Sequence, residues 1–277
     1  MADYSDSKKN VGAIFLDNEI ESAFGRTEPL LTPEKLIQRH LWGINLTSRY
    51  MDPLTRKPYQ ITTDMLQDYI LGAVQEAEID LGLVIMPTQF DKKSHYHRKD
   101  YQQWGYFMLD MKPISSLDKM SIQFADGSET FVFPNSWIEA ANLVWGQVNL
   151  IPATFNGFLA PSASETSSSL LYLQFFNTNW VSALVRFVYT AGFANGKVPR
   201  VVNDYIGIVA AMGVLSRLAA TNTLNTSSSL SIDGLSQSLS GPGNQMFLPR
   251  MKELAETREK LGKSIKKIYR RIVISSV

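Results

Sequence analysis

Residues 188–199 read VYTAGFANGKVP, and this stretch decides how the chain folds. The alternation of apolar side chains up to Tyr189 predicts a strand, and Gly192 would end it. Pro199 comes next, and proline suits the first turn of a helix because it fixes φ and needs no backbone donor there. The stretch therefore predicts a strand, a turn and a helix start in succession.

Two helices are predicted after this start. Apolar residues cover almost the whole surface of the helix expected at 200–221, which indicates burial in its own fold or against neighbouring subunits. The helix expected at 247–268 has one apolar seam, with residues at steps of three, four or seven. The side chains predicted to pack between subunits are Tyr205, Ile206, Val209, Met251, Leu254, Leu261 and Ile265.

The connection between these helices includes NTSSSLSIDGLSQSLSGPGN, residues 225–244. Its serine-rich composition is typical of an extended loop that must thread or adapt. The alternative is a surface loop in which Asp233-Gly234 forms a tight turn.

Two motifs in this region resemble one known family. Val188–Phe193, followed by Val198-Pro199 at the start of an apolar helix, resembles the head-tail connector (adaptor, head completion) proteins of tailed bacteriophages. Residues 231–238 are similar to the Asp-Gly-x-Ser loop that follows that helix in the family. The resemblance covers 31–82 and 188–277, and the middle of the chain shows no specific match.

The resemblance implies a structural virion protein with no enzymatic activity and no cofactor or metal. Such a protein forms a ring below the portal, shares its symmetry with twelve copies, and extends the DNA channel. The expected partners are the portal protein, the next neck or tail protein and further copies of the chain, with a non-specific DNA contact left open. The expected location is the head-tail junction of the virion, after assembly in the host cytoplasm. The residues implied at the channel or at a seam between subunits are Ser231, Asp233, Gly234 and Ser236.

The C-terminal segment 270–277 is the predicted portal-docking tail. The last helix is acidic early and basic late, which the helix dipole alone explains. The basic run continues beyond that helix into a β-prone tail, however, and such a tail is suited to adding a strand to a partner's sheet. In the family this segment docks into the portal, which implies that role for Arg270, Arg271, Ile272, Val273 and Ile274.

Two earlier helices are predicted at 32–42 and 64–81. Thr32 supplies a capping hydroxyl for the first, and Thr63 or Asp64 for the second. His40 lies on the apolar face of the first helix, where a packed histidine is expected rather than a metal ligand. The pair Glu76 and Asp80, four residues apart, is expected to be a solvated acidic face rather than an acid/base pair.

The segment between these helix pairs is predicted to be mostly β. Leu83–Met86 indicates a strand, and the alternating segments on either side of Asp126-Gly127 indicate a hairpin. The fold class is therefore α+β, a helical bundle core with an inserted β-rich module. The expected parts are an N-terminal arm at 1–30, a helical core at 31–83 plus 191–269, the insertion at 84–190, and the tail at 270–277.

The composition narrows the class of protein. A formal net charge of +1, from 27 Lys and Arg against 26 Asp and Glu, is unlike that of a protein that coats nucleic acid. The absence of cysteine excludes disulfides and thiolate metal sites. The polar start MADYSDSKKN lacks a signal-peptide core, and the apolar run at 205–215 is too short to cross a bilayer, so a soluble protein with no membrane partner is expected.

One group of residues could hold a metal ion. Asp91, His95, His97 and Asp100 fall within ten residues, and two histidines two apart on an extended segment point to the same side. Lysines and an arginine crowd the same segment, so an exposed loop or partner surface is the favoured reading, ahead of a nucleic-acid contact or a metal site. The functional alternatives are another neck or tail-completion (stopper) protein and, more remotely, a metal-dependent hydrolase.

Overall fold

The computed structural model describes residues 14–15, 25–51, 56–95, 106–123, 127, 129–150, 184–193, 196–222, 228–232, 235–239 and 247–269. The chain divides into two compact units. The first, here called the β unit, comprises residues 1–27, 83–197 and 269–277, and the second, the helical unit, comprises 28–82 and 198–268. Helices and strands are both present in antiparallel arrangements, so the predicted α+β class is confirmed.

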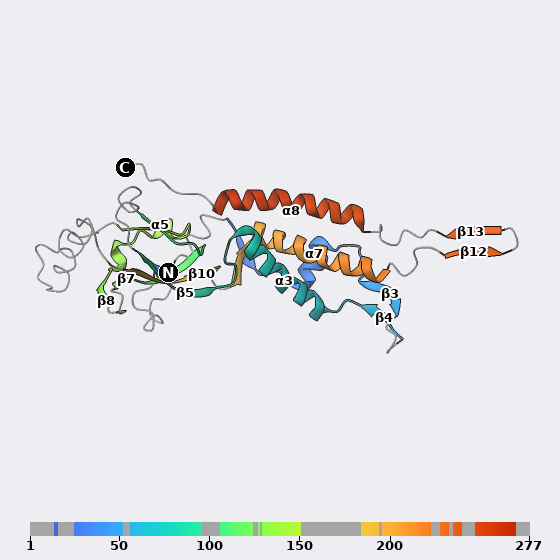
Figure 1. Ribbon diagram of the computed structural model, residues 1–277, viewed down its shortest axis with the longest axis horizontal. Helices are drawn as coiled ribbons and strands as arrows, with labels where there is room; N and C mark the ends of the chain where they lie inside the picture. The colour runs from blue at the N-terminus through green and yellow to red at the C-terminus, as the bar shows by residue number, and fades with distance from the viewer. Residues whose placement is uncertain are drawn as a thin grey trace, which may run out of the picture. The chain divides into compact units, whose positions relative to one another are not determined.

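The β unit is organised around a five-stranded antiparallel sheet with the order β1-β7-β10-β5, in which β8 pairs with β7 (Figure 1). The five strands are β1 (Ile14–Phe15), β5 (Thr88–His95), β7 (Ile114–Gln123), β8 (Glu129–Val132) and β10 (Leu184–Ala191). The predicted hairpin around 126–127 is confirmed, since β7 pairs with β8. A two-residue part of the predicted N-terminal arm, β1, adds to this same sheet beside β7.

β10 lies in the middle of the sheet, and its side chains alternate strictly between the two faces. Val185, Phe187, Tyr189 and Ala191 are buried, whereas the residues between them are partly exposed. A period of two is what a strand with one wet and one dry face requires. The strand predicted up to Tyr189 is therefore confirmed, and its dry face forms the core of the β unit.

The strand predicted at Leu83–Met86 is wrong. Those residues are extended chain, and the strand β5 follows them over the polar segment TQFDKKSH. β5 pairs only with β10 in the described sheet, which makes it an edge strand. An edge strand can carry charged side chains because its outward face meets water, and so hydrophobicity alone does not locate it.

The remaining short elements of the β unit sit around this sheet. β6 (Tyr106–Met108) pairs with β9 (Gln147–Asn149), and a short helical stretch, η2 (Asn135–Trp137), precedes α5 (Ala140–Leu143). The Phe107 and Phe187 rings meet edge to face with centroids 5.7 Å apart. Because one ring belongs to β6 and the other to β10, this contact joins the small sheet to the large one.

The helical unit contains four helices: α2 (Pro33–His40), α3 (Thr63–Leu81), α7 (Arg200–Asn222) and α8 (Leu248–Tyr269). All four lie where they are predicted from the sequence. The Thr32 hydroxyl caps α2 as expected, by accepting a hydrogen bond from the Lys35 amide. The cap of α3 is Thr62, which precedes both predicted candidates, Thr63 and Asp64, and its hydroxyl accepts from the Met65 amide at 3.4 Å.

α7 is the core of the helical unit. Val202, Ile206, Ala211, Val214 and Leu215 are all at most 1 % exposed. By length and composition α7 could cross a membrane, contrary to the expectation from the shorter run 205–215, but most of the span is buried. Such burial is typical of the central helix of a compact unit.

Smaller strands complete the helical unit. β3 (Thr47–Met51) pairs with β4 (Pro58–Gln60). β2 (Thr27–Pro29) pairs with β11 (Lys197–Pro199), and these two strands contain the first residues of the two chain segments of the helical unit, Glu28 and Val198. Within the extended loop predicted between α7 and α8, β12 (Ser228–Ile232) and β13 (Leu235–Leu239) pair as an antiparallel hairpin. Their register runs from Ser228 opposite Leu239 to Ile232 opposite Leu235.

Candidate assembly surface

Arg258 joins three helices of the helical unit. Its guanidinium Nη2 donates to Glu76 Oε1 at 2.7 Å and also to Asp80 Oδ2, and its Nε donates to the Tyr205 hydroxyl at 3.2 Å. The Tyr205 hydroxyl in turn donates to Asp80 Oδ2 at 2.9 Å. The guanidinium also lies over the Tyr205 ring, 5.8 Å from its centroid. One cation of α8 thus holds two carboxylates of α3 and a phenol of α7.

Two of the groups in this cluster, Asp80 and Tyr205, have shifted pKa values. The hydrogen bond from Arg258 holds the pKa of Asp80 below its ordinary value. Burial raises the pKa of Tyr205. The expectation of a purely solvated acidic face is therefore wrong for Glu76 and Asp80, because both are committed to Arg258.

A second polar network fixes the start of α7. Arg39 of α2 donates two hydrogen bonds to Glu28, at 2.7 and 2.9 Å. Asn203 is fully buried, and its side chain accepts from the Leu31 amide and donates to the Pro29 carbonyl. Arg39 lowers the pKa of Glu28 to about 2. This network ties the segment before α2 to the first turn of α7.

The glycines of α7 serve packing inside one copy. A Cβ atom at Gly207 would lie 2.4 Å from His40 Nε2, and one at Gly213 would lie 3.0 Å from the Tyr69 ring. His40 is packed, as expected, and no hydrogen-bond partner for its Nε2 exists among the described residues. Burial lowers the pKa of His40. These positions therefore need glycine to accommodate side chains of α2 and α3.

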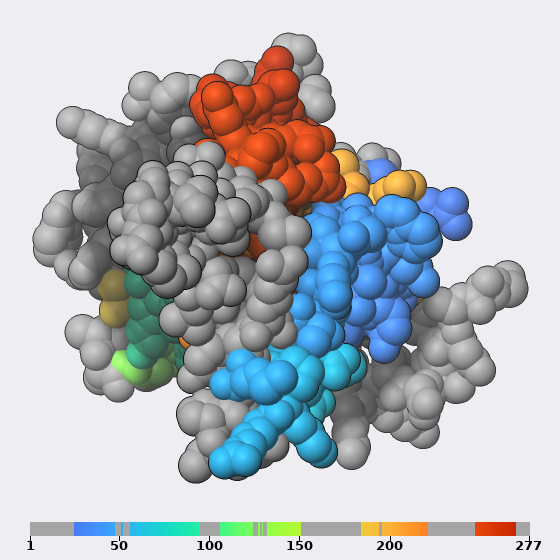
Figure 2. Space-filling view, turned by 90° about the vertical axis from the view of Figure 1, so that its right-hand side faces the viewer, coloured from blue at the N-terminus to red at the C-terminus, as the bar shows by residue number. Residues whose placement is uncertain are grey.

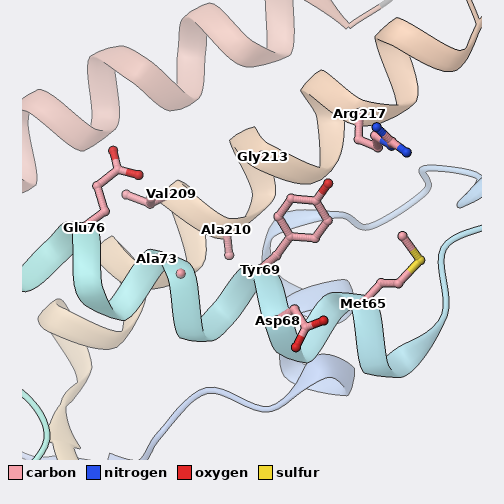
Figure 3. Close-up of a pocket in the computed structure, with 10 residues that line it drawn as sticks. Met65, Asp68, Tyr69, Ala73, Glu76, Val209, Ala210, Gly213 and Arg217 are labelled. Carbon is pink, nitrogen blue, oxygen red and sulfur yellow. The ribbon is translucent and has the colours of Figure 1, made fainter.

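An open groove of about 610 Å³ runs between α3 and α7. Small residues form much of its lining, among them Gly72, Ala73, Ala210 and Gly213. Figure 3 shows the Tyr69 ring over α7 near Gly213, with Glu76 toward one end of the groove and Arg217 toward the other. Met65, Asp68 and Val209 complete the lining. The groove leaves a stretch of two helices uncovered in the single copy.

The outward face of α3 combines acidic and apolar side chains. Asp64, Asp68 and Gln75 are exposed, and between them Leu71 is 43 % and Ile79 82 % exposed. These five residues recur at steps of three or four, so they form one stripe along the helix. Leu71 and Ile79 are thus aliphatic side chains left in water on an otherwise polar stripe.

The outward face of α8 is mostly basic. Lys252, Lys260, Lys263 and Lys267 are exposed, and Glu256 is the acidic member of the same stripe. The opposite side of α8 carries Leu254 and Ile265, which are buried. Figure 2 shows the surface of α8 in red, reaching the solvent like the blue surface of residues 25–51.

The side chains predicted to pack between subunits lie mainly inside the single copy. Tyr205, Ile206, Val209, Leu254 and Ile265 are each at most 7 % exposed. Met251 and Leu261 of the same seam are half-buried. The helical unit thus brings all seven residues into or beside its own core, and a contact of theirs with another subunit stays a prediction.

The other predicted sites are only partly described. Ser231 lies in β12 and Ser236 in β13, directly opposite each other. Asp233, Gly234 and the tail 270–277 lie outside the described residues. Asp91 and His95 belong to β5, whereas His97 and Asp100 lie outside the described residues. Asp91 accepts two hydrogen bonds from Arg186 at 2.6 and 2.8 Å, so it is already paired with a cation. In the part of the chain that the structure describes, no group of three potential metal ligands is found.

Arg258 is the residue that sequence reasoning missed. It falls within the apolar seam of α8, seven residues after Met251 and seven before Ile265. A charged residue at a seam position signals a partner of opposite charge, because burying an unpaired cation is costly. In the structure that partner is the acidic pair Glu76 and Asp80 on α3, four residues apart.

Comparisons with known proteins give few matches. The sequence matches no protein-family model and no curated protein. One similar solved structure is the neck of an empty gene transfer agent particle computed with C6 symmetry, with 13 % identity, a TM-score of 0.39, and coverage of 78 % of this chain and 82 % of that one. Another is the virion of a native gene transfer agent particle, with 12 % identity, a TM-score of 0.39, and coverage of 90 % and 93 %. At these values neither structure assigns a fold family or a role to this chain.

Proposed function

We propose that this chain is a structural virion protein that acts as a head-tail adaptor. Copies would form a ring below the portal, extend the DNA channel and join head to tail. The helical unit would be the core of the ring, and the insertion at 84–190, which supplies most of the β unit, would face outward or toward the next tail component. The tail 270–277, with Arg270, Arg271, Ile272, Val273 and Ile274, would bind the portal protein.

The observation that carries this proposal is the path of the chain from β10 to α8. A strand ends in the motif resembling the adaptor family, Pro199 precedes the apolar helix α7, and the strands β12 and β13 come before α8 in the chain. This is the order of parts that the resemblance implies. The exposed aliphatic side chains of α3 and the open groove beside them supply surface for contacts with neighbouring subunits.

Co-sedimentation with portal-bearing heads tests the proposal. Purified full-length protein should sediment with these heads and not with heads that lack the portal. A variant lacking 270–277 should remain in the supernatant, because it has lost the basic, β-prone segment. Arg270→Ala with Arg271→Ala is the matched variant that keeps the tail length and removes only its charge.

The possible outcomes separate the competing functions. Equal binding by the full-length and truncated proteins would keep the neck assignment and remove the role of the tail. If the full-length protein binds tails but not heads, it is a tail-completion protein instead. His95→Ala with His97→Ala should bind heads as well as the unchanged protein, and an assembly defect in that variant would revive a role for these histidines.

A further inference from the structure

Two helices of the helical unit carry opposite charge. α3 contains the five acidic residues Asp64, Asp68, Glu76, Glu78 and Asp80 and no basic one. The second half of α8, from Lys260 to Tyr269, contains four lysines and no acidic residue. Attraction between the two is already used once inside the copy, where Arg258 holds Glu76 and Asp80.

That internal pairing leaves an acidic and a basic face pointing outward. Asp64 and Asp68 are exposed on the stripe that also carries Leu71 and Ile79. Lys260 and Lys267 are exposed on the opposite side of α8 from its buried seam. Each stripe extends over 16 residues, from Asp64 to Ile79 and from Lys252 to Lys267, so its ends are 15 steps apart, or about 22 Å at 1.5 Å per step. The two faces match in length and are complementary in charge.

The two faces also point in different directions. Each stripe lies on the side of its helix away from the buried residues, which include Leu66 and Ile70 in α3 and Leu254 and Ile265 in α8. The α3 face therefore cannot meet the α8 face of the same copy, but it can meet that of a second copy. A contact between two different patches is heterologous, and repeating it produces a ring or a filament rather than a closed pair.

We propose that copies of this chain associate head to tail, with the basic face of α8 in one copy on the acidic face of α3 in the next. Lys260 and Lys267 face Asp64 and Asp68, and Leu71 and Ile79 become buried at the contact. Asp68 also lines the groove between α3 and α7, so the contact continues into that groove. This inference rests on the proposed ring and names the surfaces that build it.

A nucleic acid is the other class of partner that a lysine face could bind. DNA would engage only the lysines, however, and would leave the exposed aliphatic residues of α3 in water. A second copy would pair the lysines of α8 with carboxylates and would also bury the exposed aliphatic residues of α3, which favours protein over DNA as the occupant.

Charge reversal in matched variants tests the contact. Asp64→Lys with Asp68→Lys makes both outward faces basic, and Lys260→Glu with Lys267→Glu makes both acidic. Self-association, followed by sedimentation velocity over a concentration series at low salt, should weaken about ten-fold or more for either variant alone. A one-to-one mixture of the two should recover it, because every contact in an alternating assembly then pairs opposite charges. Arg56→Glu with Lys57→Glu, a reversal of two exposed residues away from both faces, is the control and should change nothing.

Each result decides between the alternatives. Unchanged association in both variants, or a mixture that fails to recover it, overturns the contact. If the lysine variant loses only binding to a DNA duplex and keeps self-association, the α8 face is a DNA surface instead. Binding of each variant to portal-bearing heads is measured in parallel, which tests the two proposals separately. Head binding without an effect of charge reversal on self-association would overturn the α3–α8 contact and leave the adaptor role standing. Loss of head binding together with the expected effect on self-association would do the reverse.

Discussion

Removing the guanidinium of Arg258 should destabilise the helical unit well beyond the loss of a surface ion pair. Arg258→Ala deletes its hydrogen bonds to Glu76, Asp80 and the Tyr205 hydroxyl, as well as the contact over the Tyr205 ring. Hydrogen bonds to charged groups contribute about 1.5–3 kcal/mol each when desolvated. The Arg258 side chain is 26 % exposed and its two carboxylate partners 49 % and 36 %, so solvent screening reduces each contribution to roughly 1 kcal/mol.

The expected loss in the free energy of unfolding is therefore about 2–3 kcal/mol. Hydrogen exchange of the amides of α3 and α8 measures it in the helical unit alone. Arg250→Ala is the matched control, because Arg250 lies on the same helix and bridges the exposed Glu253, so it should cost less than about 0.5 kcal/mol. Equal protection factors in the two variants would show that the three-helix cluster contributes nothing beyond an exposed pair.

Three further predictions concern stability. Because Arg39 lowers the pKa of Glu28 to about 2, the stabilisation from this pair should be complete above pH 4.5 and should disappear as the pH falls toward 2; Arg39→Met should flatten that part of a stability-against-pH curve. Gly207→Ala should lower the free energy of unfolding by about 1–2 kcal/mol, measured by urea denaturation, since its Cβ would clash with His40. Gly72→Ala, at a helical site with no atom near the new Cβ, should instead raise stability by about 0.5–1 kcal/mol, and the same sign for both variants would contradict the packing described.

The helices could be predicted because local signals agree there with the final packing. Thr32-Pro33 opens α2, Gly82 ends α3 in a left-handed conformation, and the apolar period of each helix matches its buried side. Where local and tertiary signals agree, sequence patterns are informative about structure.

The edge strand β5 shows where this reasoning fails. Its segment contains Asp91, Lys92 and Lys93, and nothing in its hydrophobicity indicates a strand. Its pairing depends on β10, which lies more than 90 residues further along the chain, as the register from Thr88 with Ala191 to His95 with Leu184 shows. A pairing with a strand that distant in sequence is not visible in the local residue pattern. The apolar Leu83–Met86 therefore predicts the strand a few residues too early.

The outward faces of α3 and α8 do not stand out in the sequence, for a related reason. The pattern of α8 identifies an apolar seam correctly, but the pattern alone does not say whether the seam faces the same chain or another one. The structure shows Leu254 and Ile265 buried within one copy. The outward stripe of α3 mixes polar and aliphatic residues and that of α8 consists of charged residues, and only their exposure in the folded unit distinguishes them from other helix positions.

The division of the helical unit into two chain segments has a consequence during synthesis. α3 is complete at residue 81, whereas its partner α7 begins at residue 200, after the whole β unit segment 83–197 has been translated. At about 5–20 residues per second, the 115 residues of that segment delay the partner by roughly 6–23 s. During this time the apolar side of α3, with Leu66, Ile70 and Val74, has no core to enter. The nascent chain therefore passes through an interval in which it is a substrate for chaperones, and the length of that interval is set by the size of the β unit.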